Sequence, residues 1–353
     1  MKQYQFAIVF VHLGLEISPT LEAFSKACID VHGKVRRILI TDHPSAPVNF
    51  DGEIVVTTEK SLASGAMLKK RGYYSKLASG YWLNTFERIF ALRALKHLPN
   101  ISSLPIIHLE SDVLPLFDSI DVDFIFRNFP NVAIPRFSET LGIGSFIFSP
   151  NTEELFSVLD KLETLAIQNV EWMENDMQLL GLALNEGIVS ELPSHPSDYF
   201  EKAFNSIKGD RLLFDGAALG QYLFGQDPFH QSGFRYSGFK NPAYVARTDI
   251  DSMKWKVESD TEGSRLVVEV DKIRYKIANL HIHSKEILPP LSLHSERWDR
   301  AIQEANGVIT RTQESTTEVS PHSKKPNLMV RLQIAKSKGL RVAIFNYLKK
   351  RLR

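Results

Sequence analysis

The sequence predicts an α/β fold: a mixed, mainly parallel sheet flanked by helices, with a small antiparallel meander. Short apolar segments alternate with helical segments over the first two hundred of the 353 residues. This alternation is typical of parallel sheets covered on both faces. Three adjacent segments, 253–258, 264–270 and 273–281, indicate the meander. The composition, 43% hydrophobic and 24% charged, is that of a globular protein and excludes a wholly disordered or fibrous chain.

The apolar segments expected to form the main sheet are 6–11, 37–41, 53–57, 105–109 and 146–148. The first helix should begin at Ser18-Pro19, because proline suits the first helical position, and a long helix should cover about 82–97. Asn151 with Glu154 forms a capping pattern for the next helix. Two further helices are expected from Asn175-Asp176 to Gly187 and from Asp215 to Gly225.

The charge distribution divides the chain. The net charge is +1, yet residues 321–353 hold ten Lys or Arg and no acid, so the remainder carries −9. A nucleic-acid-binding domain usually shows the opposite sign, and we expect no nucleic-acid partner. The expected division is a main domain over 1–290, a helix and a Ser/Thr/Pro-rich linker over 291–327, and a basic amphipathic helix over 328–353.

The strongest chemical feature is a pair of acids, Glu110 and Asp112, directly after the strand at 105–109. Ligands bind beyond the carboxyl ends of parallel strands, and hard cations such as Mg²⁺ or Mn²⁺ prefer carboxylate oxygens. The alternative is a solvated turn, in which Asp and Ser are also common.

A second feature is His281-Ile282-His283-Ser284-Lys285, at the end of the last meander segment. On a strand, His281 and His283 project to the same face. Their spacing could also suit zinc, but no cysteine or third clustered histidine accompanies them.

These features resemble the GT-A glycosyltransferases, in particular the glycogenin and lipopolysaccharide galactosyltransferase type. The resemblance covers about 1–285 and rests on the order of elements: a helix bearing Arg88, the acids, and the segment 142–151. It departs at Glu110, where the family's D-x-D motif has Asp. The resemblance implies a GT-A-like fold, a nucleotide-diphosphate sugar donor, and Mn²⁺ or Mg²⁺ held by Asp112, Glu110 and one of the two histidines.

The resemblance also implies roles for residues around the metal. Lys285 and Arg88 would contact the donor diphosphate, and guanidinium geometry suits phosphate. His12 and Asp42, after the first two strands, would contact the nucleoside. A plain structural role is the alternative for each.

The acceptor side is expected to include five positions. Gly144 and Ser145 lie in a small-residue loop whose main-chain N–H groups could bind sugar hydroxyls. Asp176 is the first candidate, and Asp215 the second, for the carboxylate that contacts or deprotonates the acceptor hydroxyl. Helix capping is the alternative for both. Asp227 ranks third and would contact the acceptor.

The resemblance therefore implies a metal-dependent glycosyltransferase acting on a glycan or lipid-linked acceptor in bacterial capsule or lipopolysaccharide synthesis. One alternative is a sugar nucleotidyltransferase, but that class carries a Gly-rich basic loop after the first strand, and Val11-His12-Leu13-Gly14 lacks it. Another is a non-catalytic protein that binds glycans or membranes on the same scaffold.

The expected location is the cytoplasm, at the inner face of the cytoplasmic membrane. Cys28 is the single cysteine, which fits a reducing compartment, and no apolar run reaches the roughly 18–20 residues of a membrane span. Residues 328–353 combine eight basic side chains with an apolar stripe. Such a helix suits an anionic membrane surface, whereas packing against a partner is the alternative.

Truncation after Pro326 should abolish binding to anionic vesicles and leave donor hydrolysis unchanged. Each basic group contributes at most about 1 kcal/mol near an anionic leaflet and less in salt, so the full chain should bind reversibly and lose binding as salt rises. Vesicle flotation measures both effects. Equal flotation of the truncated and full-length chains would assign residues 328–353 another role.

Overall fold

A computed structural model of the chain describes part of its residues. All belong to one compact unit, Met1–Arg311. The described residues are 5–14, 19–27, 35–43, 50–57, 60–71, 81–196, 198, 211–225, 250–260, 263–282 and 292–307. The predicted amphipathic helix at 328–353 lies outside them, and the predicted domain boundaries stay predictions.

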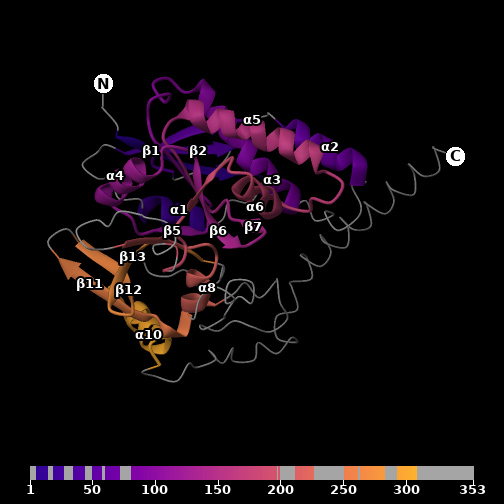
Figure 1. Cartoon of the computed structure of the whole chain (residues 1–353). Helices are drawn as coiled ribbons and strands as arrows, with labels where there is room; N and C mark the ends of the chain where they lie inside the picture. The colour runs from indigo at the N-terminus through magenta and orange to yellow at the C-terminus, as the bar shows by residue number, and fades with distance from the viewer. Residues whose placement is uncertain are drawn as a thin grey trace, which may run out of the picture. The chain divides into compact units, whose positions relative to one another are not determined.

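The large sheet has the order β3-β2-β1-β4-β8-β6-β7, and β9 pairs with β6 (Figure 1). Four neighbouring strands are parallel: β3 (Glu53–Val56), β2 (Val35–Thr41), β1 (Phe6–His12) and β4 (Ile106–Leu109). Antiparallel pairs join β4 to β8 (Phe146–Ser149), β8 to β6 (Ala133–Ser138), and β6 to β7 (Leu141–Gly142). The edge strand β9 (Ser190–Leu192) runs parallel to β6.

Alternate residues of this sheet enter two different cores. From β1, Ala7, Val9 and Val11 face one core, and Phe6, Ile8 and Phe10 face the other. The first core is covered by α2 (Leu62–Arg71), α3 (Tyr81–Ala91), α5 (Thr152–Gln168) and α6 (Asp176–Asn185), together with a 3₁₀ helix, η2 (Leu92–His97). Figure 1 shows α5 alongside α2 on this side of the sheet. A strand buried on both faces is expected of a parallel sheet.

The second core is closed by α1 (Pro19–Ala27), α4 (Ser119–Asn128) and a second sheet. The second sheet has the order β10-β13-β12-β11, and β5 also pairs with β13. Its strands are β5 (Val113–Pro115), β10 (Arg211–Phe214), β11 (Lys254–Asp260), β12 (Gly263–Val270) and β13 (Ile273–His281). Two helices, α8 (Leu219–Phe224) and α10 (Glu296–Ala305), pack with these strands around Trp255 and Trp298.

The fold class predicted from the sequence is confirmed for the described residues, and so are the five strands of the main sheet and the meander. Two helix predictions were wrong in their bounds. The helix expected over 82–97 is α-helical only to Ala91 and continues as 3₁₀ helix. The helix expected from Asp215 begins at Leu219, because residues 215–218 form a turn around the Asp215 carboxylate.

Two elements carry conflicting local signals. Strand β6 contains Pro135, which cannot donate to a strand ladder and argues against a central strand. Helix α4 has apolar residues at every second position, Val122, Phe124 and Phe126, as a strand would. Tertiary packing overrides both patterns. Among the described helices, none has the length and apolar character needed to span a membrane.

An ion cluster ties β13 of the second sheet to the start of helix α4. The ammonium of Lys276 on β13 lies 2.5 Å from Asp121 and 2.7 Å from Asp118, at the start of α4. Burial raises the pKa of Asp121 to about 6, although the nearby Lys276 charge lowers it.

Replacing Lys276 with Met should lower the free energy of unfolding by about 3–5 kcal/mol at pH 7.5, because Asp121 becomes a buried, unpaired charge. The loss should shrink toward pH 5. The Lys276 ammonium lowers the pKa of Asp121, so without it the folded pKa rises further above the unfolded value. The folded variant therefore takes up the proton at a higher pH than folded wild type does, and it regains stability relative to wild type as pH falls. Urea unfolding at the two pH values measures both effects.

Lys256→Met is the matched control. Lys256 pairs with Glu258 at 2.8 Å but is 39% exposed, so its loss should be at most about 1 kcal/mol. An equal loss in both variants, or a Lys276→Met effect that is independent of pH, would contradict this account.

Candidate active site

Glu110, Asp112 and His281 form a cluster in which each offers a ligand atom within 4.8 Å of the other two. The imidazole Nε2 of His281 lies 3.4 Å from Asp112 Oδ1 and 3.6 Å from Glu110 Oε2. Glu110 and His281 are buried, and Asp112 is partly buried. The cluster lies at the carboxyl end of β4, where the sequence predicts a ligand site.

Strand pairing brings this cluster together. The chain leaves the large sheet at Leu109, passes through the acids, and enters the second sheet as β5. Strand β5 pairs antiparallel with β13, with Val113 opposite His281. The N–H of Ile282 then donates to the carbonyl of Asp112 at 2.8 Å. Asp112 and His281, which are 169 positions apart in the sequence, are thereby held side by side.

Helix α3 supplies the cation of the site. Arg88 Nη2 donates to Glu110 Oε1 at 2.5 Å, which leaves Glu110 Oε2 directed toward His281. Thr85, one helical turn earlier, donates its hydroxyl to Asp176 Oδ1 at 3.1 Å. Side chains three residues apart share a helix face, so α3 holds two carboxylates from one side. Thr85 was not among the predicted site residues. Its i, i+3 spacing to Arg88, which places both side chains on one helix face, was the signal that could have identified it.

The electrostatics of the cluster favour an added cation. Burial raises the pKa of Glu110, and the charges of Arg88 and His281 offset this effect only in part. Burial alone would lower the pKa of His281, but the charge and hydrogen bond of Asp112, with the charge of Glu110, raise it to about 9. A protonated His281 is thus a second positive charge beside the buried acids, in addition to Arg88.

The donor set fits a divalent cation of the Mg²⁺ or Mn²⁺ type. Two carboxylates and one imidazole converge, and oxygen ligands with a single nitrogen suit Mn²⁺ in particular. Metal binding displaces protons from its ligands, so a cation would replace the proton on His281. Glu110, Asp112 and His281 are the residues that would hold it.

Asp176 is the first residue of α6 but not its N-cap. Asn175 is the cap, since its side chain accepts the N–H of Gln178 at 3.0 Å. Burial raises the pKa of the Asp176 carboxyl, against the opposing effects of the Arg88 charge and the Thr85 hydrogen bond. The main-chain N–H groups at the start of α6 also lower this pKa, and burial outweighs them. Arg88 therefore acts on both Asp176 and Glu110.

A glycine sets the position of α6. A Cβ on Gly181 would lie 2.0 Å from the Thr140 carbonyl oxygen, so α6 packs directly on the main chain before β7. The start of α6 lies against α3, where Asp176 accepts the Thr85 hydroxyl.

Asp215 follows β10 and is fully buried. Its two carboxylate oxygens accept main-chain N–H groups from Ala218, Leu219, Gly220 and His281, at 2.7–2.8 Å. Asp215 was the second candidate for the carboxylate that contacts the acceptor hydroxyl. In that role, the hydroxyl would compete with these four N–H groups for the carboxylate oxygens.

The two nucleoside candidates lie at the same edge of the sheet as the acids. His12 ends β1 and Asp42 follows β2, and these strands are parallel neighbours in the order β2-β1-β4. Asp42 Oδ1 accepts the N–H of Gly14 at 2.8 Å. The shared edge is the one predicted from strand polarity.

Gly144 and Ser145 lie beside the acids. A Cβ on Gly144 would lie 3.8 Å from Glu110 Oε1, and the Ser145 carbonyl accepts the N–H of Glu110 at 3.1 Å. The Ser145 hydroxyl is buried and has no hydrogen-bond partner in the described part of the chain. The main-chain carbonyl of Ser145, rather than its hydroxyl, thus holds the main chain of Glu110 in place.

Three predicted site residues, His283, Lys285 and Asp227, lie outside the described residues. The sequence analysis did not weigh His108, which is buried on β4 with Nδ1 3.0 Å from the Val9 carbonyl. Burial, with the Arg88 charge, lowers the pKa of His108 to about 3, so this imidazole is neutral and adds no charge to the cluster.

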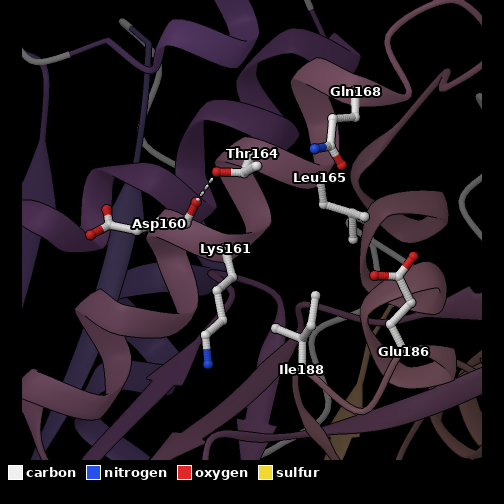
Figure 2. Close-up of a pocket in the computed structure, with 7 residues that line it drawn as sticks. All are labelled: Asp160, Lys161, Thr164, Leu165, Gln168, Glu186 and Ile188. Atoms are coloured by element: carbon white, nitrogen blue, oxygen red, sulfur yellow. Dashed lines mark hydrogen bonds between the residues drawn. The ribbon is translucent and has the colours of Figure 1, made fainter.

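A separate hollow of about 360 Å³ lies between α5 and the turn after α6 (Figure 2). It is lined by five residues of α5 and two after α6: Asp160, Lys161, Thr164, Leu165, Gln168, Glu186 and Ile188. The Thr164 hydroxyl donates to the Asp160 carbonyl at 3.0 Å. None of the cluster residues lines this hollow, so we assign it no part in the site.

No protein-family profile matches the sequence, and no curated protein matches it. Several glycosyltransferases are among the solved structures similar to this chain. GlyE of Streptococcus pneumoniae TIGR4 is 15% identical over 57% of this chain and 47% of its own, with a TM-score of 0.36. The match therefore spans about half the length of GlyE.

Two further structures cover more of their own length. Galactosyltransferase LgtC, solved with donor and acceptor sugar analogues, is 12% identical over 88% of this chain and 98% of its own, with a TM-score of 0.39. Mouse xyloside xylosyltransferase 1 is 10% identical over 56% and 93%, with a TM-score of 0.35. At these values the matches establish no activity for this chain. Its GT-A-like architecture, as predicted, rests on its own strand order and on the acids after β4.

His281→Ala should abolish Mn²⁺ binding, because His281 supplies the one imidazole of the cluster, whereas His283→Ala should retain it. Isothermal titration of the full-length variants with MnCl₂ measures both affinities. If His283→Ala lost affinity and His281→Ala kept it, the ligand assignment would be reversed.

Proposed function

We propose that the protein is a metal-dependent glycosyltransferase that moves a sugar from a nucleotide-diphosphate sugar to a glycan or lipid-linked acceptor. The observation that carries the proposal is the buried Glu110–Asp112–His281 cluster at the carboxyl end of β4. A divalent cation bound there would neutralise charge on the diphosphate as it leaves.

The residues of the site then have separate tasks. Asp112, Glu110 and His281 hold the cation, and Arg88 fixes Glu110 through its 2.5 Å hydrogen bond. Lys285 contacts the diphosphate, and His12 and Asp42 contact the nucleoside at the ends of β1 and β2. In the transfer, the bond between the anomeric carbon and the diphosphate oxygen breaks and a bond to the acceptor oxygen forms.

Asp176 is the residue we assign to the acceptor hydroxyl. Its burial and raised pKa support the assignment, because a base with a raised pKa accepts a proton more readily. The Thr85 hydrogen bond orients the carboxylate. The acceptor proton goes to Asp176, and the nucleoside diphosphate departs. Gly144 and Ser145, which lie beside Glu110, also contact the acceptor.

The setting that we propose is bacterial capsule or lipopolysaccharide synthesis at the inner face of the cytoplasmic membrane. The support is the basic, apolar-striped segment 328–353, which suits an anionic lipid surface. A lipid-linked acceptor would then be met at that surface.

Asp112→Asn should remove Mn²⁺-dependent donor binding and hydrolysis while the fold is kept. A panel of nucleotide sugars is screened for an Mn²⁺-dependent rise in melting temperature, since a ligand that binds the folded state raises stability. Hydrolysis of the hit is then followed in metal-controlled buffer. Turnover by the variant at the wild-type rate would contradict the proposal. Donor hydrolysis by wild type at the same rate with and without a chelator would also contradict it.

Asp176→Asn should separate transfer from donor binding. The variant should keep Mn²⁺ and donor affinity but lose about 10²-fold or more in transfer rate, the usual contribution of a general base. Glu174→Gln, an exposed neighbour, is the matched control. An Asp176→Asn rate within a few-fold of wild type would remove the assignment. Mn²⁺-dependent donor binding without any hydrolysis or transfer in wild type would instead indicate a non-catalytic binding protein.

A further inference from the structure

The contacts of Asp215 go beyond those of a helix cap. Three of the four N–H groups that it accepts come from Ala218, Leu219 and Gly220, at the turn that enters α8. The fourth comes from His281 on β13, at 2.8 Å, and it shares Oδ2 with Gly220. A cap needs only the first three. The fourth joins the carboxylate to the main chain of a cluster residue.

The same turn also contacts the other side of the His281 main chain. A Cβ on Gly220 would lie 2.2 Å from the carbonyl oxygen of His281 and 2.8 Å from its carbonyl carbon. Such distances are far inside normal contact, so a side chain larger than hydrogen cannot be accommodated there without movement. Asp215 thus holds the N–H of His281, and Gly220 lies against its C=O.

The turn is itself fixed to β13. The main-chain N–H of Asp215 donates to the Asn279 side-chain oxygen at 3.2 Å, and β10 pairs in parallel with β13 up to Phe214 and Asn279. On its other edge, His281 is paired with Val113 of β5. The main chain of His281 is therefore fixed from both edges of the strand.

We propose that Asp215 is a positioning residue for the metal ligand His281, and that Gly220 acts with it. This inference rests on the proposed function, in which His281 binds the cation. It replaces the catalytic role that the sequence suggested for Asp215. The carboxylate is fully buried, and its two oxygens accept four main-chain N–H groups at 2.7–2.8 Å. These hydrogen bonds fix the main-chain position from which the His281 imidazole extends.

The physical reason is the small tolerance of metal geometry. A ligand displaced by a few tenths of an ångström loses coordination strength, and residues that orient metal ligands commonly change metal affinity about 10–100-fold when replaced. The Asp215–Gly220 contacts set the His281 main chain, and through it the distance from the imidazole to the two carboxylates.

Asp215→Asn should weaken Mn²⁺ binding about 10–100-fold. The introduced amide NH₂ would face N–H groups at one oxygen position, so either His281 and Gly220 or Ala218 and Leu219 lose their acceptor. Mn²⁺ affinity is measured by isothermal titration of the full-length chain, and stability by thermal unfolding without metal. Asp215→Glu, which keeps both oxygens, should retain more affinity than Asp215→Asn.

Gly220→Ala tests the same inference without changing the carboxylate, should Asp215→Asn fold poorly. It should also weaken Mn²⁺ binding, and the His281 imidazole resonance should shift in the metal-free protein. Asp198→Asn is the matched control: Asp198 is buried and accepts the N–H groups of Ser194 and His195 at 2.8 and 2.9 Å. It should lower the melting temperature and leave Mn²⁺ affinity unchanged.

The outcomes separate the two proposals. Absence of Mn²⁺ binding in wild type would end the proposed function. Wild-type affinity in folded Asp215→Asn or Gly220→Ala, with wild type binding Mn²⁺ normally, would end the positioning role alone. Affinity losses that merely follow the melting temperature, with Asp198→Asn losing as much, would reduce Asp215 to a structural cap.

Discussion

The antiparallel pairing of β5 with β13 is the interaction on which the candidate site depends. It takes the chain out of the large sheet directly after the acids and sets Val113 opposite His281. Without this pairing, Glu110 and Asp112 would follow a strand with no third ligand beside them. The hydrogen bond from Ile282 to Asp112, 2.8 Å long, belongs to the same junction. The site is therefore formed where two sheets meet, not within either one.

That junction collects charge that the protein must neutralise. Glu110, Asp112 and Asp176 lie near one another with Arg88 and His281 as the countercharges, and burial penalises each ionised carboxylate. A buried acid cluster is stable only with cations or protons close by. The raised pKa of His281 and the raised pKa of Glu110 are two effects of this one constraint, and a divalent cation would relieve both.

Much of the candidate site could be predicted from local sequence patterns. Glu110 and Asp112 follow an apolar strand, and the carboxyl ends of β1, β2 and β4 lie at one edge by the polarity of a parallel sheet. His281 ends the last of the three segments predicted to form the meander. Asp176 and Arg88 lie on helices that the sequence predicts, from Asn175-Asp176 to Gly187 and over about 82–97. Asp215 could not be interpreted in this way, because a cap, a base and a positioning group have the same local sequence and differ only in the atoms they contact.

The sequence by itself determined the α/β class, the main parallel strands, the meander and the acidic character of the edge, because apolar periodicity and residue chemistry are local properties. The tertiary structure decided that Asp215 accepts the N–H of His281, that Asn175 rather than Asp176 caps α6, and that α8 begins at Leu219. It also joined Asp112 to His281. These outcomes depend on long-range strand pairing and on burial, and both are fixed by packing between segments far apart in the chain.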